Sequence, residues 1–214
     1  MMIDWGMTGL EVEQESFRQI EEEMGAHEFC AEEWRVVRRM IHTCANFAVA
    51  EKVHFAGAPV NACLEALSDG VPLYSDSNMI RSGLSVARMA QLNPGYKRDS
   101  IHCYVADEEV ARKAKEEGIT RSLAALEKAR PVIDGGIVLI GNAPLALAGI
   151  ARMIKEDGVR PRLVIGMPVG FVHVEESKDM IMECDVPQVV LKGRMGGSPL
   201  AVAALHGMIE SMTD

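Results

Sequence analysis

His42 has the residue type and the position that most directly suit it to chemistry. It falls near the C-terminal end of a helix predicted over residues 31–45, where free backbone carbonyls favour a protonated imidazole. Arg38 and Arg39, one turn earlier, oppose that positive charge. An anionic ligand that neutralised both arginines would favour the imidazolium, and His42 would then be a general acid activated by its own substrate. The alternative is a histidine at the edge of an amphipathic helix, packed or solvated and without a chemical role.

Three glycine-rich loops form the second candidate, because each follows a predicted strand. They cover residues 141–144, 166–171 and 193–199. The carboxyl ends of parallel strands meet at one edge of a sheet, so the loops should line a common crevice with Arg194 beside it. The first and third loops run into helix starts, where free N–H groups suit a carboxylate or a phosphate. None has the spacing of a dinucleotide or Walker A loop, and each glycine alone could serve only a tight turn.

Other residues are given smaller roles. Cys44 lies on a different helix face from His42, so a nucleophilic Cys–His pair is not expected. Asp76 ends a possible strand before Ser77 and Asn78, and we expect it to do no more than take part in a helix cap. No metal site is predicted, because no spacing places two of the remaining histidines on one ion. Those histidines are His54, His102, His173 and His206.

The elements that must position these residues follow from capping signals and hydrophobic patterning. A capping box at residues 8–11 predicts a first helix that ends at Gly25. Beyond the second helix, strands and helices alternate, which predicts an α/β fold of three layers, α/β/α, with a largely parallel central sheet and an N-terminal helical arm. The strands are expected at residues 71–75, 101–105, 137–140, 163–165 and 189–191. The helices are expected at residues 58–67, 79–91, 108–129, 143–157, 175–183 and 199–212.

Composition limits the classes of function. The 214 residues are 48% hydrophobic with a net charge of −9, and residues 1–34 hold ten acidic side chains against one basic side chain. The remaining residues hold 21 of each sign, so we predict one domain over residues 1–214 with an acidic arm at residues 1–34. Nucleic-acid binding is disfavoured, since the only compact basic group is Arg35, Arg38 and Arg39.

Membrane insertion and export are not expected either. No stretch is long and unbroken enough to span a bilayer, and the acidic N-terminal residues are unlike a signal peptide. Five cysteines without a C-x-x-C pair argue against a disulfide scaffold. We therefore expect a cytoplasmic protein without a membrane partner.

Taken in order along the chain, the motifs resemble those of the precorrin-8X methylmutase family. They lie at residues 16–17, 41–43, 76–83, 141–144, 165–172, 176–178 and 193–198. The resemblance implies an enzyme of cobalamin biosynthesis that moves a methyl group from C-11 to C-12 of a corrinoid ring. The product would be hydrogenobyrinate, or cobyrinate when cobalt is already present. It also implies that no external cofactor takes part and that the protein is a homodimer with sites at the subunit contact.

The resemblance also implies roles for single residues. His42 falls on the family's catalytic proton donor or acceptor, and Ser16 and Arg39 fall on substrate contacts. Two departures concern this site: Asn46 stands where the family commonly has an acid, and Met195 stands where it usually has a lysine. The motifs add further expected substrate-binding residues, namely Thr43, Arg81, Gly141, Asn142, Arg194, Gly196, Gly197 and Ser198.

Two other functions are kept as alternatives. A corrinoid carrier would bind the same pigment without converting it, and a nucleotide- or SAM-dependent enzyme would use the same crevice. The loops and the 14 methionines suit a broad apolar macrocycle rimmed by carboxylates. A methyl shift is a rearrangement, so one positioned acid can suffice for it.

Overall fold

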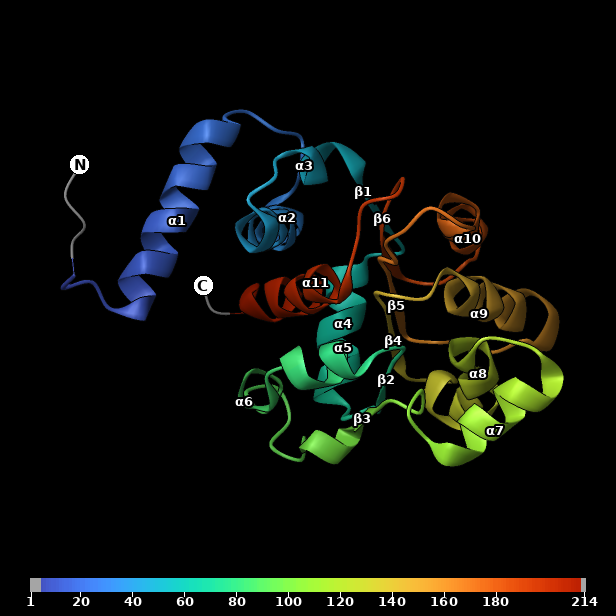
Figure 1. Cartoon of the computed structure of the whole chain (residues 1–214). Coiled ribbons are helices and arrows are strands. Elements are labelled where there is room, and N and C mark those ends of the chain that lie inside the picture. The colour runs from blue at the N-terminus through green and yellow to red at the C-terminus, as the bar shows by residue number, and fades with distance from the viewer. Residues whose placement is uncertain (1–4, 213–214) are drawn as a thin grey trace.

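The computed structural model describes residues 5–212, so Asp4 of the acidic arm and both ends of the 1–214 span lie outside it. Its described part contains one six-stranded sheet in the order β1-β6-β5-β4-β2-β3 (Figure 1). Neighbouring strands are parallel except for β1, which pairs antiparallel with β6. The strands are β1 (Val53–Ala56), β2 (Leu73–Ser75), β3 (Ile101–His102), β4 (Ile137–Ile140), β5 (Leu163–Gly166) and β6 (Gln188–Leu191).

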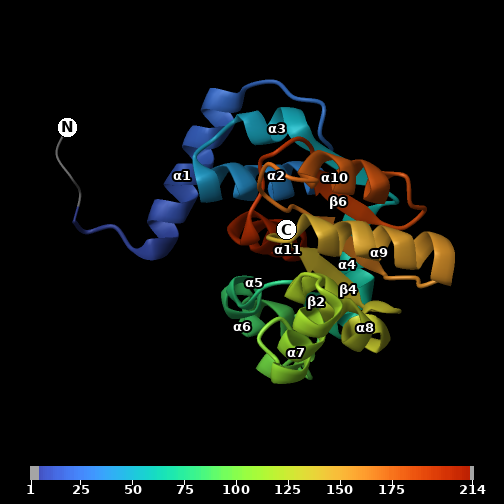
Figure 2. The same cartoon turned by 45° about the vertical axis from the view of Figure 1, so that its right-hand side comes forward.

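Helices cover both faces of the sheet, which explains why the central strands are short apolar runs. Alternate residues of β4 enter different cores: Ile137 and Leu139 pack on one face, and Val138 and Ile140 on the other. The first face carries α2 (Ala31–Cys44), α4 (Pro59–Ser68), α5 (Asn78–Gly83), α6 (Val86–Met89) and α11 (Ser198–Glu210). The opposite face carries α7 (Glu108–Glu117), α8 (Arg121–Ile133), α9 (Pro144–Asp157) and α10 (Val174–Met182) (Figure 2).

The N-terminal helix α1 (Gly9–Met24) stands at the side of this body, against α2 (Figure 1). The predicted capping box is confirmed: Thr8 N–H donates to Glu11 Oε2 at 2.7 Å, and Glu11 N–H donates to Thr8 Oγ1 at 3.3 Å. Gly25 ends the helix with φ of 62°. No residue of α1 is buried, so this helix is an arm rather than a part of the core.

Several predicted boundaries are wrong, each for a local reason. The predicted helix 108–129 is two helices, because Gly118 adopts φ of 67° and Thr120 caps the second one. The predicted helix 79–91 is also divided, since Leu84 is extended and Ser85 caps α6. Strand β3 covers only two of the five residues predicted at 101–105. Strand β1 and the short helix α3 (Ala48–Lys52) before it were not predicted.

None of the helices in residues 5–212 is long and apolar enough to cross a lipid bilayer.

Candidate active site

His42 lies in the last turn of α2, as predicted, and its side chain is half-buried. Helices α2 and α11 pack side by side in opposite directions. At one end the backbone of Val36 lies against Gly207, and at the other Thr43 and Ser198 line one cavity. Because α11 begins directly after the loop that follows β6, the last turn of α2 lies at the carboxyl edge of the sheet.

Helix α1 encloses His42 from the other side. The Phe17 ring meets the imidazole edge-on, with ring centroids 5.3 Å apart. Next to it, Ser16 and His42 line one cavity of about 380 Å³ between the two helices. The Ser16 hydroxyl donates to the Val12 carbonyl at 2.7 Å, so its oxygen can still accept a hydrogen bond from a ligand. The structure thus brings together the predicted catalytic residue and one predicted substrate contact.

The arginines beside His42 already have carboxylate partners. Arg38 pairs with Glu21 of α1 and lies over the Phe17 ring, 4.2 Å from its centroid. Arg39 is buried and pairs with Glu13 of α1 at 2.8 Å and with Glu210 of α11. The premise that their charges await a bound anion is therefore wrong.

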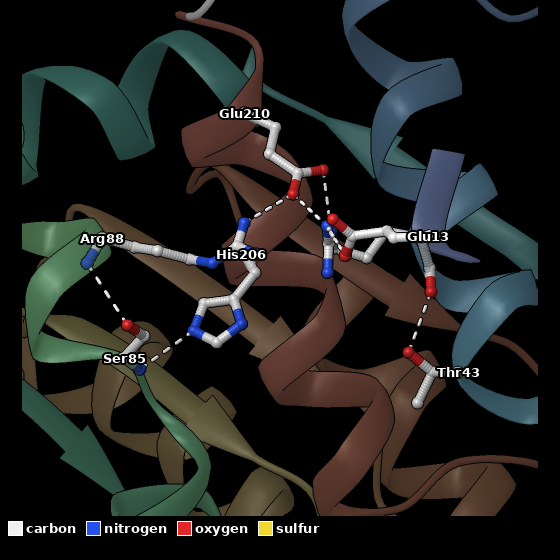
Figure 3. A network of polar contacts seen from close by, with 7 residues as sticks. Glu13, Thr43, Ser85, Arg88, His206 and Glu210 are labelled. Carbon is white, nitrogen blue, oxygen red and sulfur yellow. Dashed lines mark hydrogen bonds and ion pairs between the residues drawn. The ribbon is translucent and has the colours of Figure 1, made fainter. Parts of the chain in front are cut away.

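Arg39 belongs to a polar network at the junction of α1, α2 and α11. Burial acts to lower the pKa of Arg39, but the carboxylates of Glu210 and Glu13 outweigh it and raise that pKa. Glu210 also accepts from Arg88 of α6, and Figure 3 shows it above His206 on the same helix. His206 Nε2 accepts a hydrogen bond from Ser85 N–H at 3.0 Å. Burial, reinforced by both arginines, lowers the pKa of His206 to about 4, so its imidazole is neutral at neutral pH.

A second cavity of about 300 Å³ lies on the other side of α2. It joins three predicted substrate contacts, Arg39, Thr43 and Ser198. The Thr43 hydroxyl donates to the Arg39 carbonyl at 2.9 Å, and the Ser198 hydroxyl lies 2.8 Å from that of Ser77. The start of α11 and the end of α2 therefore border one cavity at the carboxyl edge, and both hydroxyl groups are hydrogen-bonded within the chain.

The first glycine-rich loop does not offer the free donors that were predicted. The buried carboxylate of Asp76 accepts from the N–H groups of Gly141 (3.0 Å), Asn142 (2.9 Å) and Ala143 (2.6 Å). Burial raises the pKa of Asp76, while these three hydrogen bonds oppose the rise. A carboxylate of the chain itself thus fills the anion position before α9. These N–H groups are therefore not free, and the substrate contacts predicted for Gly141 and Asn142 stay a prediction.

The third loop packs tightly on the second. A Cβ on Gly196 would overlap the carbonyl oxygens of Met167 and Pro168, so only glycine fits there. Gly197 N–H donates to Met167 O at 2.8 Å. Arg194 is exposed on this loop, where Nε donates to Glu175 at 3.2 Å and the guanidinium lies 5.6 Å from the Phe171 ring centroid. The prediction that these loops meet at one sheet edge is confirmed.

Arg81 lies at the other end of that edge. Its Nε donates to the Ile101 carbonyl at 3.0 Å, and its guanidinium is 3.6 Å from Asp99. Strands β2, β4 and β5 separate β3 from β6 in the sheet order. The structure therefore does not bring Arg81 next to Arg194.

Comparison with known proteins decides the family. The sequence model described as precorrin-8X methylmutase matches residues 11–211. The chain belongs to the precorrin-8X methylmutase family. A cobalt-precorrin-8 methylmutase of Leptospira interrogans is 37% identical over 209 residues, covering 94% of this chain and 93% of that protein. A precorrin-8X methylmutase of Pseudomonas aeruginosa is 33% identical, with 97% and 98% covered.

A solved structure supports the same assignment. The precorrin-8X methylmutase of Thermus thermophilus superposes with a TM-score of 0.85 at 42% identity, covering 94% of this chain and 95% of that one. The predicted family, the α/β fold class and the prediction of an isomerase of cobalamin biosynthesis are thereby confirmed.

The two departures from the precorrin-8X methylmutase pattern have structural counterparts. Asn46 Oδ1 accepts from Ala48 N–H at 3.0 Å, so this side chain caps the turn before α3. Met195 lacks the charge of the usual lysine, but Lys52 Nζ lies 3.8 Å from its sulfur. A cation from α3 therefore stands beside position 195.

Sequence reasoning missed three residues that shape this methylmutase site. The sequence predicts only a helix-cap role for Asp76, although an acid directly after a buried strand lies at the carboxyl edge of the sheet. Phe17 belongs to the motif at residues 16–17, but the sequence predicts no role for it. Lys178 belongs to the motif at residues 176–178 without a predicted role, and its side chain is wholly buried beneath the third loop. A lysine in an apolar helix position was the available signal.

Proposed function

We propose that this protein catalyses the C-11 to C-12 methyl shift on precorrin-8X or cobalt-precorrin-8, giving hydrogenobyrinate or cobyrinate. Family membership over residues 11–211 supports the reaction. The observation that carries the mechanism is the position of His42, half-buried in a cavity with Ser16 at the carboxyl edge of the sheet. A proton donor that is shielded from bulk water yet open to a cavity can reach a bound ring.

The carboxyl edge has the chemistry that a corrinoid needs. Large apolar side chains are exposed just after β2, β4 and β5, and Arg194 follows β6. A corrinoid is a broad apolar ring rimmed by acetate and propionate groups, so such a surface can pack on the ring while cations bind its rim. The exposed apolar residues are Met79, Leu145, Val169, Phe171 and Val172.

In the proposed mechanism, the protein holds the corrinoid ring in position and transfers a proton. Substrate and product are isomers: the bond from the methyl group to C-11 breaks and a bond to C-12 forms, with no net change in composition. We assign to His42 the proton transfer that stabilises charge developing on the ring, and to Ser16 and Thr43 contacts that orient the ring. Such a general acid contributes about 10²–10⁴-fold to the rate.

We also propose that the protein acts as a cytoplasmic homodimer. In support, α1 has no buried residue. Apolar side chains are exposed just before α1 and in its first turn, and a second copy of the chain could cover them. These side chains are Trp5, Met7, Leu10 and Val12. The five cysteines are all unpaired, as is usual in a reducing compartment. Size-exclusion chromatography with light scattering tests the dimer.

The decisive experiment incubates the purified protein with precorrin-8X and, separately, with its cobalt form, and follows the visible spectrum. Appearance of the rearranged corrin supports the proposal and identifies the substrate. The His42→Ala variant should still bind the pigment yet convert it about 10²–10⁴-fold more slowly. His27→Ala is the matched control, because His27 stacks on Trp34 at the opposite end of α2.

Two results would contradict the proposal. Binding without conversion by the wild-type protein would indicate a corrinoid carrier. Full activity of His42→Ala would remove the role assigned to this histidine. Calorimetry with NAD, ATP and SAM tests the nucleotide alternative, which the Asp76 carboxylate already disfavours by filling the anion position before α9.

A further inference from the structure

Lys178 is a wholly buried cation beneath the loop that carries Arg194. It lies on α10, and none of its side-chain surface is exposed. Its ammonium donates to the Gly193 carbonyl at 2.6 Å and to the Met195 carbonyl at 2.7 Å. These are the residues on either side of Arg194. The buried charge is thus satisfied by the backbone of a single loop segment.

This arrangement determines how Arg194 is presented. The carbonyls before and after Arg194 both turn inward to Lys178, whereas the Arg194 carbonyl accepts from Gly170 N–H at 3.3 Å. The Arg194 side chain itself is 59% exposed and lies beside Phe171. Lys178 thus holds the backbone on both sides of a guanidinium that pairs with Glu175 at 3.2 Å at the surface.

Burying the ammonium is unfavourable for the fold. Burial, with a smaller contribution from Lys52, lowers the pKa of Lys178 to about 8, and Glu175 opposes the decrease. An apolar side chain of similar length would fill the same space without desolvating a charge, but it would leave the Gly193 and Met195 carbonyls without this donor. The lysine at this position therefore serves these two carbonyls rather than the packing of the core.

We propose that Lys178 is a positioning residue that holds the carbonyls on both sides of Arg194 and thereby directs this arginine onto the surface that receives the acidic substrate. The role rests on the proposed function, because Arg194 is assigned to a carboxylate at the rim of the corrinoid. Lys178 itself is too deeply buried to contact the ring.

The test compares Lys178→Met with Lys155→Met. Both remove a lysine from a helix, but Lys155 pairs with Glu183 at the surface of α9. Without substrate, hydrogen–deuterium exchange of the 193–197 segment should be faster in Lys178→Met and unchanged in Lys155→Met. With precorrin-8X, Lys178→Met should raise KM by about tenfold, the effect of weakening one charge-assisted contact, with a much smaller change in kcat.

A double variant separates positioning from general damage. If Lys178 acts through Arg194, adding Lys178→Met to Arg194→Met should leave KM unchanged from the Arg194→Met value. Thermal unfolding checks that Lys178→Met is folded, because the gain from removing a buried charge is opposed by the loss of a donor for the Gly193 and Met195 carbonyls. If this variant does not fold, Lys178→Gln replaces it in both measurements.

Three results distinguish the ways in which the proposal can fail. Unchanged loop exchange and unchanged KM in a folded Lys178 variant would overturn it. Independent, additive effects of Lys178→Met and Arg194→Met would overturn the link to Arg194. A wild-type protein that converts no pigment would overturn the proposed function and the substrate role, while the exchange measurement would still decide whether Lys178 holds the loop.

Discussion

The Phe17 ring of α1 meets the His42 imidazole of α2 edge-on, with centroids 5.3 Å apart and ring planes at 69°. The same ring lies beneath the Arg38 guanidinium, and ion pairs from Glu13 and Glu21 hold α1 on either side of it. Phe17 is thus the aromatic contact through which the arm restrains the proposed proton donor. The orientation of His42 depends on a helix that has no buried residue of its own.

Phe17→Ala should therefore lower kcat for the methyl shift by about tenfold, because an edge-on aromatic contact contributes about 0.5–1.5 kcal/mol beyond its buried area. Phe17→Leu keeps apolar volume between the helices and should lose less activity. Steady-state kinetics with precorrin-8X measure the change, and circular dichroism checks that α1 remains folded. Wild-type kcat in Phe17→Ala would argue against a positioning role for this ring.

Asp76→Asn should destabilise the fold by about 1–3 kcal/mol, the usual cost of a buried donor left without an acceptor. In the wild type, the three N–H groups donate to the two carboxylate oxygens of Asp76. The asparagine amide has only one oxygen, so at least one N–H group loses its acceptor. Urea unfolding measures the loss. Asp69→Asn is the matched control: its partner Arg162 lies at the surface, and we expect a change within about 0.5 kcal/mol.

His206 should make stability depend on pH between 4 and 6.5. Its pKa is lowered from 6.5 to about 4 in the folded protein, so the unfolded chain binds this proton at higher pH. The contribution of neutral His206 to the free energy of unfolding is fully present above pH 6.5. This contribution is lost as the pH falls toward 4, by at most about 3 kcal/mol. His206→Gln keeps an acceptor for Ser85 N–H and should show a shallower loss in urea unfolding over this range. Parallel pH profiles would refute the assignment.

Gly196→Ala should separate the second and third loops, because the added methyl would overlap two carbonyl oxygens of the second loop. We expect a loss of about 1–3 kcal/mol in stability together with reduced conversion. Gly9→Ala provides the comparison, since a Cβ there meets no atom within 4 Å and Gly9 opens a helix. Thermal unfolding of both variants, followed by the spectral assay, measures the difference. Equal melting temperatures would show that the loops tolerate a side chain at 196.

Much of the fold could be predicted because local signals were strong. The run at residues 137–140 gave β4 with its bounds, and the Thr8–Glu11 capping box marked the start of α1. The failures lie where local and tertiary preferences compete. Gly118 and Ser85 carry turn and cap signals inside patterns that otherwise continue as helix. Strand β1 has only four residues, all half-buried, and it follows α3 directly without a turn signal between them.

The positions of the candidate site residues could be predicted from the sequence better than the contacts of their side chains. Sequence placed His42 in the last turn of a helix and the loops at one edge, and both placements are confirmed. It could not reveal that Arg39 pairs with Glu13 and Glu210, because the partners are 26 and 171 residues away along the chain. The hydrogen bonds from the N–H groups of residues 141–143 to Asp76 could not be predicted either, because these residues also lie far from Asp76 along the chain.

The antiparallel direction of β1 allows a short connection between the sheet and the end of α2, where His42 lies. Because β1 runs against β6, it enters the sheet at Val53 opposite Leu191, and Lys52 O accepts from Lys192 N–H at 2.9 Å. The segment leaving α2 therefore needs only α3 to reach the edge where the loops gather. A first strand of the opposite sense would begin one strand length away, about 13 Å for four residues, and its connection would draw the end of α2 away from the carboxyl edge of the sheet. A single reversed strand thus allows one short connection to join α2 to the sheet.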